Sequence, residues 1–361
     1  MAGKPIKGLA LSELFYREAV EPILETHFPG LAYSAARINS GSDVMGFDDA
    51  ISTDHYWGPI LEIYLSSEDY SNYRDKLDAA MREELPREVA GFSTNFETRP
   101  DGSMKPCDSG PIEHRICFFC SDTFVYSYRP FNPLKELTAL DWLMLTQQRL
   151  RCIRAGKVFY DGLSELERIR EKLHYYPRDV WLHLMAAQWC RIGQEQAFPG
   201  RCQHVGDELG SRLIATRLVQ DLMQLCFFIE REYAPYSKWF GAAFAQLKCA
   251  QELRPLFQGV ITGPTWQERE DSLVQAYQTV GKLQNSLAII EPLPVETGNY
   301  FNRPYQVINT NFAKALYEAI KDEEVKKLPI GVGAVDQFLN STDVLDNNSR
   351  RERLVGLYSG D

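Results

Sequence analysis

The first 130 residues alternate between helical and strand-like hydrophobic patterns. Residues 9–27 are predicted to form a helix because their apolar side chains recur at helical spacing, at Leu11, Leu14, Phe15, Ala19, Ile23 and Leu24. Residues 68–85 show a helical pattern with a polar face and end before Pro86. Four stretches rich in β-forming residues predict strands: 31–39, 58–66, 90–97 and 112–119. This order predicts a small domain in which helices flank a sheet.

Beyond about residue 130 the hydrophobic pattern changes to long segments with a period near 3.6 residues. A run of helices is predicted to start within 132–156 and to continue over 179–195, 207–233, 237–253, 265–290 and 309–327. No repeat of constant length is present, which argues against a solenoid. We therefore predict an α+β protein, with a mixed-sheet domain over 1–130, an all-α helical bundle over 131–345 and a frayed polar tail over 346–361.

Composition and charge restrict the kind of partner. The 361 residues are 44% hydrophobic, so the chain is long enough to bury a substantial core. The formal net charge of -10 argues against nucleic acid or an anionic membrane as the main partner. No stretch reaches the roughly 18 apolar residues of a membrane span, and the N-terminal residues lack the apolar core of a secretory signal. The eight cysteines are scattered, several of them inside predicted helices, so we expect reduced thiols and a cytoplasmic protein.

The stretch GSDVMGFDDAISTDHYW, residues 41–57, carries four aspartates. Gly41 would let the backbone approach a ligand closely, and the hydroxyl of Ser42 can donate a hydrogen bond. Eleven residues separate Ser42 from Asp54, which stands just before the second predicted strand and would point its carboxylate into the same corner. Mg²⁺ binds carboxylates and nucleotide phosphates together. The stretch therefore predicts a site for Mg²⁺ and a phosphorylated ligand.

These residues resemble the signature of the polymerase-beta-type nucleotidyltransferase superfamily, which has a Gly-Ser pair, here followed four residues later by Gly46, and an aspartate at the start of the next strand. The helical half resembles the C-terminal bundle of kanamycin-nucleotidyltransferase-like proteins, above all in YAPYSKWF, residues 233–240. With GDELGSR (206–212) and VDQFLNSTDVL (335–345), nearly the whole chain resembles an uncharacterised family of nucleotidyltransferase-like proteins. The resemblance implies that the mixed sheet is of the nucleotidyltransferase type.

The resemblance also implies a reaction. Mg²⁺ ions held between carboxylates and ATP, or another nucleoside triphosphate, would activate an acceptor hydroxyl, which takes the nucleoside monophosphate while pyrophosphate leaves. Gly41 and Ser42, with Asp43 beside them, would hold the phosphates, and Asp54 would be the first metal ligand and a catalytic residue. The expected partners are the nucleotide and a small-molecule acceptor, with a protein acceptor less favoured.

Tyr56 departs from this pattern. Two residues after Asp54 the superfamily has a second carboxylate, and a neutral phenol is a poor ligand for Mg²⁺. Glu97 and Glu113, on later predicted strands, are the candidates for the missing metal ligand, and Glu113 is also a candidate catalytic residue. Glu62 lies eight residues past Asp54. That is roughly 26 Å along a strand, which is too far to share an ion.

The neighbouring loop residues leave two interpretations open. Asp48 and Asp49 would reach the metal if the loop folded back, but the more ordinary interpretation makes them turn formers and solvated charges. Asp43 is undecided between the two. His55 would lie on the opposite strand face from Asp54, which favours a packed histidine over a metal ligand.

Candidate groups in the helical half would act on the triphosphate or on the acceptor. Lys238 and Arg212 are candidate charge partners for the triphosphate, with a surface salt bridge as the competing interpretation. Glu208 is a candidate general base for the acceptor hydroxyl, because related aminoglycoside enzymes use a glutamate from outside the metal corner. Its place in a helix first turn is also explained by the helix dipole. Tyr233 and Tyr236 would either stack on a base or pack in the core.

Two functions from different classes therefore remain. The first is a Mg²⁺-dependent nucleotidyltransferase. The second is a nucleotide-binding pseudoenzyme, a sensor or scaffold that has lost a metal-binding carboxylate, for which Tyr56 is the motivation. The two differ in whether nucleotide binding is followed by release of pyrophosphate.

Overall fold

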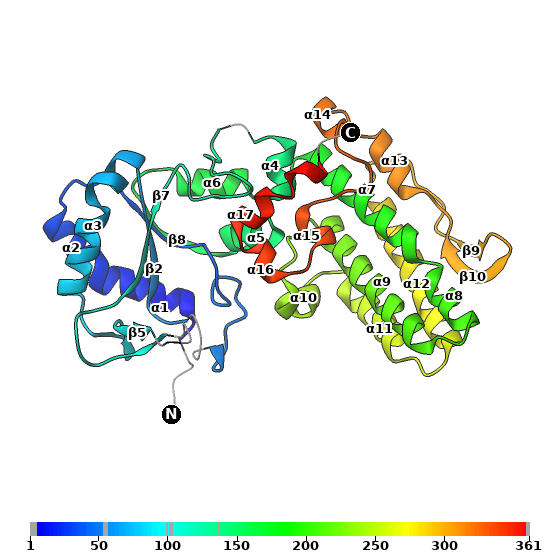
Figure 1. Cartoon of the computed structure of the whole chain (residues 1–361), viewed down its shortest axis with the longest axis horizontal. Coiled ribbons are helices and arrows are strands. Elements are labelled where there is room, and N and C mark those ends of the chain that lie inside the picture. The colour runs from blue at the N-terminus through cyan, green and yellow to red at the C-terminus, as the bar shows by residue number, and fades with distance from the viewer. Residues whose placement is uncertain (1–5, 53–56, 99, 101–103, 136, 359–361) are drawn as a thin grey trace. The chain divides into compact units, whose positions relative to one another are not determined.

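The structure is a computed structural model that describes residues 6–358 apart from 53–56, 99, 101–103 and 136 (Figure 1). It has two compact units. The first unit comprises Met1–Leu137 and Arg149–His174, and the second comprises Thr138–Gln148 and Tyr175–Asp361. The single boundary predicted at residue 130 differs from this division, because the chain leaves the first unit after Leu137 and returns to it at Arg149.

The first unit is built on a four-stranded mixed sheet in the order β7-β2-β1-β8. Its strands are β1 (Ser34–Arg37), β2 (Ile60–Leu65), β7 (Arg115–Cys120) and β8 (Lys157–Asp161). β2 and β7 run parallel, whereas β1 is antiparallel to both β2 and β8. This sheet, its flanking helices and the helical C-terminal region confirm the predicted α+β class. β8 was not predicted, because it lies among segments with helical periodicity.

Helices cover the sheet and bury an apolar core. The N-terminal helical stretch runs through α1 (Gly8–Phe15), a π-helical turn over Tyr16–Val20 and α2 (Glu21–His27), while α3 is Ser67–Glu84. α3 begins where the Ser66 side chain accepts a hydrogen bond from the Asp69 N–H, a standard N-terminal cap. Side chains from these helices and from the strands form one buried cluster, which includes Phe15, Val20, Leu61, Ile63, Leu77 and Met81.

The predicted strand over 90–97 is wrong. The structure has two small hairpins in that region, made of β3 (Glu88–Val89) with β4 (Phe92–Ser93), and β5 (Phe96–Thr98) with β6 (Met104–Pro106). Ala90 and Gly91 both have positive φ, at 52° and 83°, which is the backbone of a tight hairpin turn. The β-forming side chains therefore serve local hairpins and add no strand to the main sheet.

The second unit is mainly helical. Its longest helices are α7 (Arg178–Glu195), α9 (Glu208–Ile229), α11 (Ala250–Thr262) and α12 (Trp266–Ser286); α9 packs against the other three, and α11 packs against α12 (Figure 1). The other helices of the chain are α4 (Ala139–Met144), α5 (Gln147–Ala155), α6 (Leu166–Lys172), α8 (Phe198–His204), α10 (Ser237–Phe244), α13 (Phe312–Glu318), α14 (Glu323–Lys326), α15 (Val335–Phe338), α16 (Thr342–Leu345) and α17 (Asn348–Glu352), with a 3-10 turn over Val355–Leu357. An unpredicted hairpin, β9 (Thr297–Tyr300) and β10 (Arg303–Ile308), precedes α13.

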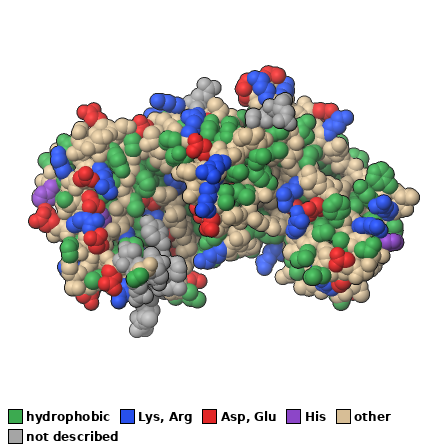
Figure 2. Space-filling model, in the orientation of Figure 1, with side chains coloured by type: hydrophobic (Ala, Val, Ile, Leu, Met, Phe, Trp, Pro, Cys, Tyr) green, Lys and Arg blue, Asp and Glu red, His purple; other side chains and the backbone are tan. Residues whose placement is uncertain are grey.

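The C-terminal residues that the structure describes are folded, which differs from the expected frayed tail. Arg351 on α17 is buried, and so is Tyr358. The Tyr358 hydroxyl donates a hydrogen bond of 2.9 Å to the Gly333 carbonyl oxygen. In the part of the chain that the structure describes, no helix has the length and apolar character to cross a membrane. Acidic and basic side chains are interspersed on the face shown in Figure 2.

Candidate functional site

The loop that follows β1 is a compact turn with a glycine that cannot be replaced by a larger residue. The N–H groups of Phe47 and Gly46 donate to the carbonyl oxygens of Ser42, at 2.8 Å, and Asp43, at 3.1 Å. Gly41 has φ of +138°. A Cβ on Gly41 would lie 2.0 Å from Asp43 Oδ1 and 2.5 Å from Arg37 Nη2. Only glycine fits this position, because the backbone passes directly against a charged pair.

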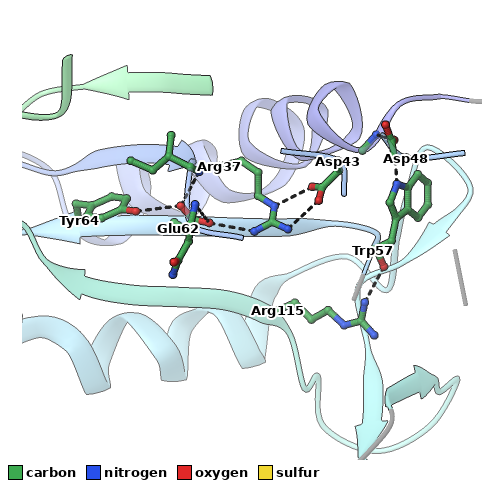
Figure 3. Close-up of polar contacts among 10 residues, drawn as sticks. Arg37, Asp43, Asp48, Trp57, Glu62, Tyr64 and Arg115 are labelled. Carbon is green, nitrogen blue, oxygen red and sulfur yellow. Dashed lines mark hydrogen bonds and ion pairs between the residues drawn. The ribbon is translucent and has the colours of Figure 1, made fainter. Parts of the chain in front are cut away.

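A buried ion network stands behind this turn. Arg37, at the end of β1, donates from Nε to Asp43 Oδ2 at 2.9 Å and from Nη2 to Asp43 Oδ1 at 3.0 Å, a bidentate pair. Its Nη1 donates to Glu62 Oε1 at 3.0 Å. All three side chains are at most 2% exposed. Figure 3 shows the guanidinium lying between the two carboxylates.

Glu62 joins β1 to β2 through further hydrogen bonds. Its carboxylate accepts from the N–H of Ile38 at 2.8 Å, from the N–H of Asn39 at 3.1 Å and from the Tyr64 hydroxyl at 2.9 Å. Burial, together with the Glu62 charge, raises the pKa of Tyr64 well above its usual value. The carboxylate of Glu62 therefore has a structural role, which its separation from Asp54 along the chain did not indicate.

Asp48 is buried and anchors the start of α1, so the expectation of a solvated loop charge is wrong for this residue. Its Oδ2 accepts from the Gly8 N–H at 2.8 Å and from Trp57 Nε1 at 3.2 Å, and its Oδ1 faces Lys7 Nζ at 3.2 Å. Burial alone would raise the pKa of Asp48, but these three donors outweigh it and lower the pKa below its ordinary value near 3.8.

Replacing Asp48 with asparagine is expected to destabilise the protein by about 1–3 kcal/mol at neutral pH, because a charge-assisted set of buried hydrogen bonds is lost. Since the folded pKa of Asp48 is depressed, its stabilisation is fully present above the unfolded value near 3.8 and disappears as pH falls through the folded value. Urea unfolding at pH 7 and pH 3 should therefore show a smaller gap between the two proteins at pH 3. Asp49→Asn is the matched control. A gap that does not change with pH contradicts the assignment.

The other loop residues divide between an exposed turn and the undescribed segment. Asp49 is exposed, and its Oδ1 accepts from the N–H groups of Ile51, at 2.9 Å, and Ser52, at 3.1 Å, as expected of a turn former. Residues 53–56, which include Asp54, His55 and Tyr56, lie outside the described residues. The predicted metal ligand and the residue that departs from the superfamily pattern both fall in this segment.

Arg115 holds the chain immediately after that segment. Its Nη1 donates to the Trp57 carbonyl oxygen at 2.7 Å, and its guanidinium lies 3.7 Å from the ring centre of Phe96. Trp57 and Arg115 are both buried. β2 therefore starts from a fixed point at the same sheet edge where β1 ends and β7 begins.

Two arginines of α5 lie beside the turn. Arg149 donates from Nη1 to the Asn39 carbonyl oxygen at 2.8 Å, and the Arg151 guanidinium lies 5.7 Å from the ring centre of Phe47. Both belong to the first unit. Sequence reasoning missed them, because they are more than 100 positions away from the turn in the chain. They bring positive charge to Asn39 and Phe47, at the two ends of the turn.

The candidate carboxylates expected on later strands each form an ion pair with a basic side chain. Glu97 on β5 pairs with Lys105 at 3.0 Å, and Glu113, just before β7, pairs with Arg82 at 2.6 Å. The Phe96 N–H donates to the Glu113 carbonyl oxygen at 3.1 Å, so the two segments are neighbours. Both carboxylates are about half exposed. Neither has a hydrogen bond or ion pair with Asp43 or Asp48 among the described contacts.

The candidate residues of the helical half belong to the second unit. Glu208 accepts from Arg269 Nη2 at 2.9 Å and from Arg212 Nε at 2.7 Å, and these two charges lower its pKa. Lys238 is exposed and lies over the ring of Trp239. Tyr233 is buried and packs against Tyr175 and Tyr176, whereas Tyr236 is half-buried. Glu208 and Arg212 thus form a salt-bridge network, and Tyr233 is a core residue.

Comparison with known proteins adds two findings. The family model described as "Domain of unknown function (DUF4037)" matches residues 142–240. Among solved structures, the chain is similar to a nucleotidyltransferase-like protein from Exiguobacterium sibiricum 255-15, with 12% identity and a TM-score of 0.33 over 75% of this chain and 78% of that one. No curated protein matches the chain.

Proposed function

We propose that the chain binds a nucleoside triphosphate at the turn of Gly41 and Ser42, and transfers its nucleoside monophosphate to the hydroxyl of a small molecule with the help of Mg²⁺. The observation that carries this proposal is the turn itself. A glycine with φ of +138° is held against a buried Arg37–Asp43 pair, and a half-buried serine hydroxyl follows it.

This turn is suited to phosphate for three reasons. The missing side chain of Gly41 allows close approach of the backbone. The Ser42 hydroxyl makes no hydrogen bond to any residue that the structure describes, so it can donate to a ligand. Arg149 and Arg151 contact Asn39 and Phe47 at the two ends of the turn and bring positive charge to this loop. A phosphate group needs donors and positive charge at short range, and this turn offers both.

The described carboxylates of this corner do not themselves form a metal site. The oxygens of Asp43 are occupied by Arg37, and those of Asp48 by Gly8, Trp57 and Lys7. Among the residues that the structure describes, no group of three His, Cys, Asp or Glu side chains is arranged to hold a metal ion. The proposal therefore assigns Mg²⁺ to Asp54.

The alternative, a nucleotide-binding pseudoenzyme, is favoured by one specific observation. The loop aspartates that would replace the carboxylate missing at Tyr56 are buried in structural contacts with Arg37 and with the start of α1. A site with its aspartates used in this way would keep the turn that binds phosphate but would have fewer free carboxylates for catalysis. Such a protein would bind the nucleotide and report its presence without releasing pyrophosphate.

Calorimetry with non-hydrolysable analogues of each nucleoside triphosphate, in the presence of Mg²⁺, tests the nucleotide site. We expect binding, and we expect Ser42→Ala to weaken it about 3- to 10-fold, in line with one lost hydrogen bond of about 1 kcal/mol. Ser52→Ala, a serine of the adjacent exposed turn, should bind like the wild type. Absence of binding by every analogue contradicts both functions.

A pyrophosphate assay with natural triphosphates and a mixture of hydroxylated small molecules then separates the two functions. The transferase is expected to release pyrophosphate and to lose that activity in Asp54→Asn, since one metal ligand is removed. Binding without pyrophosphate release supports the pseudoenzyme.

A further inference from the structure

The second unit contains a pocket of about 370 Å³, within the size range of small-molecule sites. It is formed by α7, the β9–β10 hairpin and the segment that leads into α13. Two of its lining rings, those of Trp189 and Phe312, stack with centres 4.6 Å apart. Gln196, directly after α7, bonds to β10 through both ends of its amide, donating to the Ile308 carbonyl oxygen at 3.2 Å and accepting from the Ile308 N–H at 3.1 Å.

The lining of this pocket combines apolar and polar side chains and carries no charge. Among the described residues that line it, none is Asp, Glu, Lys, Arg or His. Amide and hydroxyl groups come from Asn309, Thr310 and Asn311. The Thr310 hydroxyl donates to the Pro294 carbonyl oxygen and Asn311 Oδ1 accepts from the Lys314 N–H at 2.9 Å, which leaves the amide of Asn309 and the amide N–H groups of Asn311 to face a ligand. The lining also includes the aromatic rings of Tyr300 and Phe301, whose centres are 4.8 Å apart in an edge-to-face arrangement. A charged ligand would find no counter-ion here, whereas a neutral ligand with hydrogen-bonding groups is matched.

Gly193 keeps one wall of the pocket open. It lies inside α7, where glycine is among the least favourable residues for helix formation. A Cβ at this position would meet no atom within 4 Å, so packing does not require glycine. Alanine would fit and would stabilise the helix. The absence of a side chain instead leaves space in the pocket.

Phe301, which also lines the pocket, is a second residue that lowers the stability of the fold. It occupies the turn between β9 and β10, has φ of +56° and is 83% exposed. This left-handed conformation suits glycine and strains a bulky residue, and an exposed ring gains little from burial. Two residues that line the same pocket therefore lower stability without helping to pack the core. Such residues are characteristic of binding sites.

We propose that this pocket binds a neutral ring with several hydroxyl groups, a sugar or sugar-like compound. Such a ring has an apolar face of C–H groups, which can pack on the aromatic rings of Tyr300 and Phe301, and hydroxyl groups, which can bond to the amides of Asn309 and Asn311. Amides both donate and accept hydrogen bonds, so they satisfy hydroxyls in either direction.

Saturation-transfer NMR on the full chain, with methyl glycosides of the common hexoses and pentoses and with adenosine as comparator, tests the proposal. We expect transfer to the ring protons of at least one glycoside. Gly193→Leu, which fills the pocket, and Phe301→Gly, which removes the aromatic rim, should each weaken binding about tenfold or more. Gly193→Ala should raise the Tm by about 2–4 °C.

Gly241→Leu is the matched control, since Gly241 is a helical glycine in α10 whose added Cβ would also meet nothing within 4 Å. It should bind the glycoside like the wild type. The proposal is overturned if no glycoside shows transfer, if adenosine alone does, or if Gly193→Leu binds as well as the wild type.

Discussion

Replacing Arg37 with methionine is expected to destabilise the protein by about 3–5 kcal/mol, because it leaves two buried carboxylates without their counter-ion. Asp43 and Glu62 are both 2% exposed, and the guanidinium donates three hydrogen bonds to them. Methionine has a similar length, so the loss is one of charge and hydrogen bonding more than of packing. The carboxylates would have to be protonated or hydrated, and either event opens the end of β1.

Urea unfolding at neutral pH measures this effect. Arg74→Met is the matched control, because Arg74 forms a solvent-exposed pair with Asp75 and its loss should leave the stability nearly unchanged. The triple variant Arg37→Met, Asp43→Asn, Glu62→Gln removes all three charges and should recover part of the lost stability. The role assigned to Arg37 is refuted if Arg37→Met costs no more than Arg74→Met.

The second large effect is expected from Gly41→Ala, at about 3 kcal/mol or more, with loss of nucleotide binding. Two costs add here. The φ of +138° disfavours any residue with a Cβ, by roughly 1–2 kcal/mol. The new methyl group would also lie 2.0 Å from Asp43 Oδ1, so the carboxylate must move away from Arg37. Chemical denaturation gives the stability change, and calorimetry with a triphosphate analogue gives the binding change.

Gly46→Ala separates the two costs, because Gly46 lies in the same loop and also has a positive φ, at +76°. A Cβ on Gly46 would meet nothing within 4 Å, so only the backbone strain of roughly 1–2 kcal/mol is expected. Equal losses for Gly41→Ala and Gly46→Ala would show that contact with the Arg37–Asp43 pair is unimportant. A stable Gly41→Ala protein that still binds nucleotide would argue against the turn as the phosphate site.

The sequence predicted the local parts of the fold well. Several long helices and three of the four sheet strands follow from periodicity within single segments, which needs no knowledge of distant partners. The helix predicted over 237–253 is wrong in extent, because the chain forms α10 and then begins α11 there, and the one predicted over 309–327 is divided into α13 and α14. β8 was missed because its short segment, KVFYD, pairs with β1 about 120 positions earlier, and no local pattern records that pairing. The segment over 90–97 was wrongly assigned to one strand because β-forming side chains suit a local hairpin equally well.

The sequence singled out the loop after β1 but not the contacts within it. The loop after β1 was identified by residue type, whereas the burial of Asp43 depends on Arg37, and that of Asp48 on Gly8 and Trp57. One signal was available: Arg37 and Glu62 are isolated opposite charges in otherwise apolar neighbouring strands. Buried charges need partners, so such a pair predicts an ion bridge between the strands. The role of Asp54 stays a prediction.

The place of β8 in the sheet also bears on how the chain can be made and divided. β1 obtains its second partner only from Lys157–Asp161, after the chain has passed through residues 138–148 of the second unit. During synthesis, at about 5–20 residues per second, the first unit therefore has no complete sheet until residues well beyond 161 have left the ribosome. A gene truncated near residue 137 would encode a sheet that lacks β8 and has β1 as an open edge. The two units therefore cannot be inherited, expressed or exchanged as simple consecutive modules.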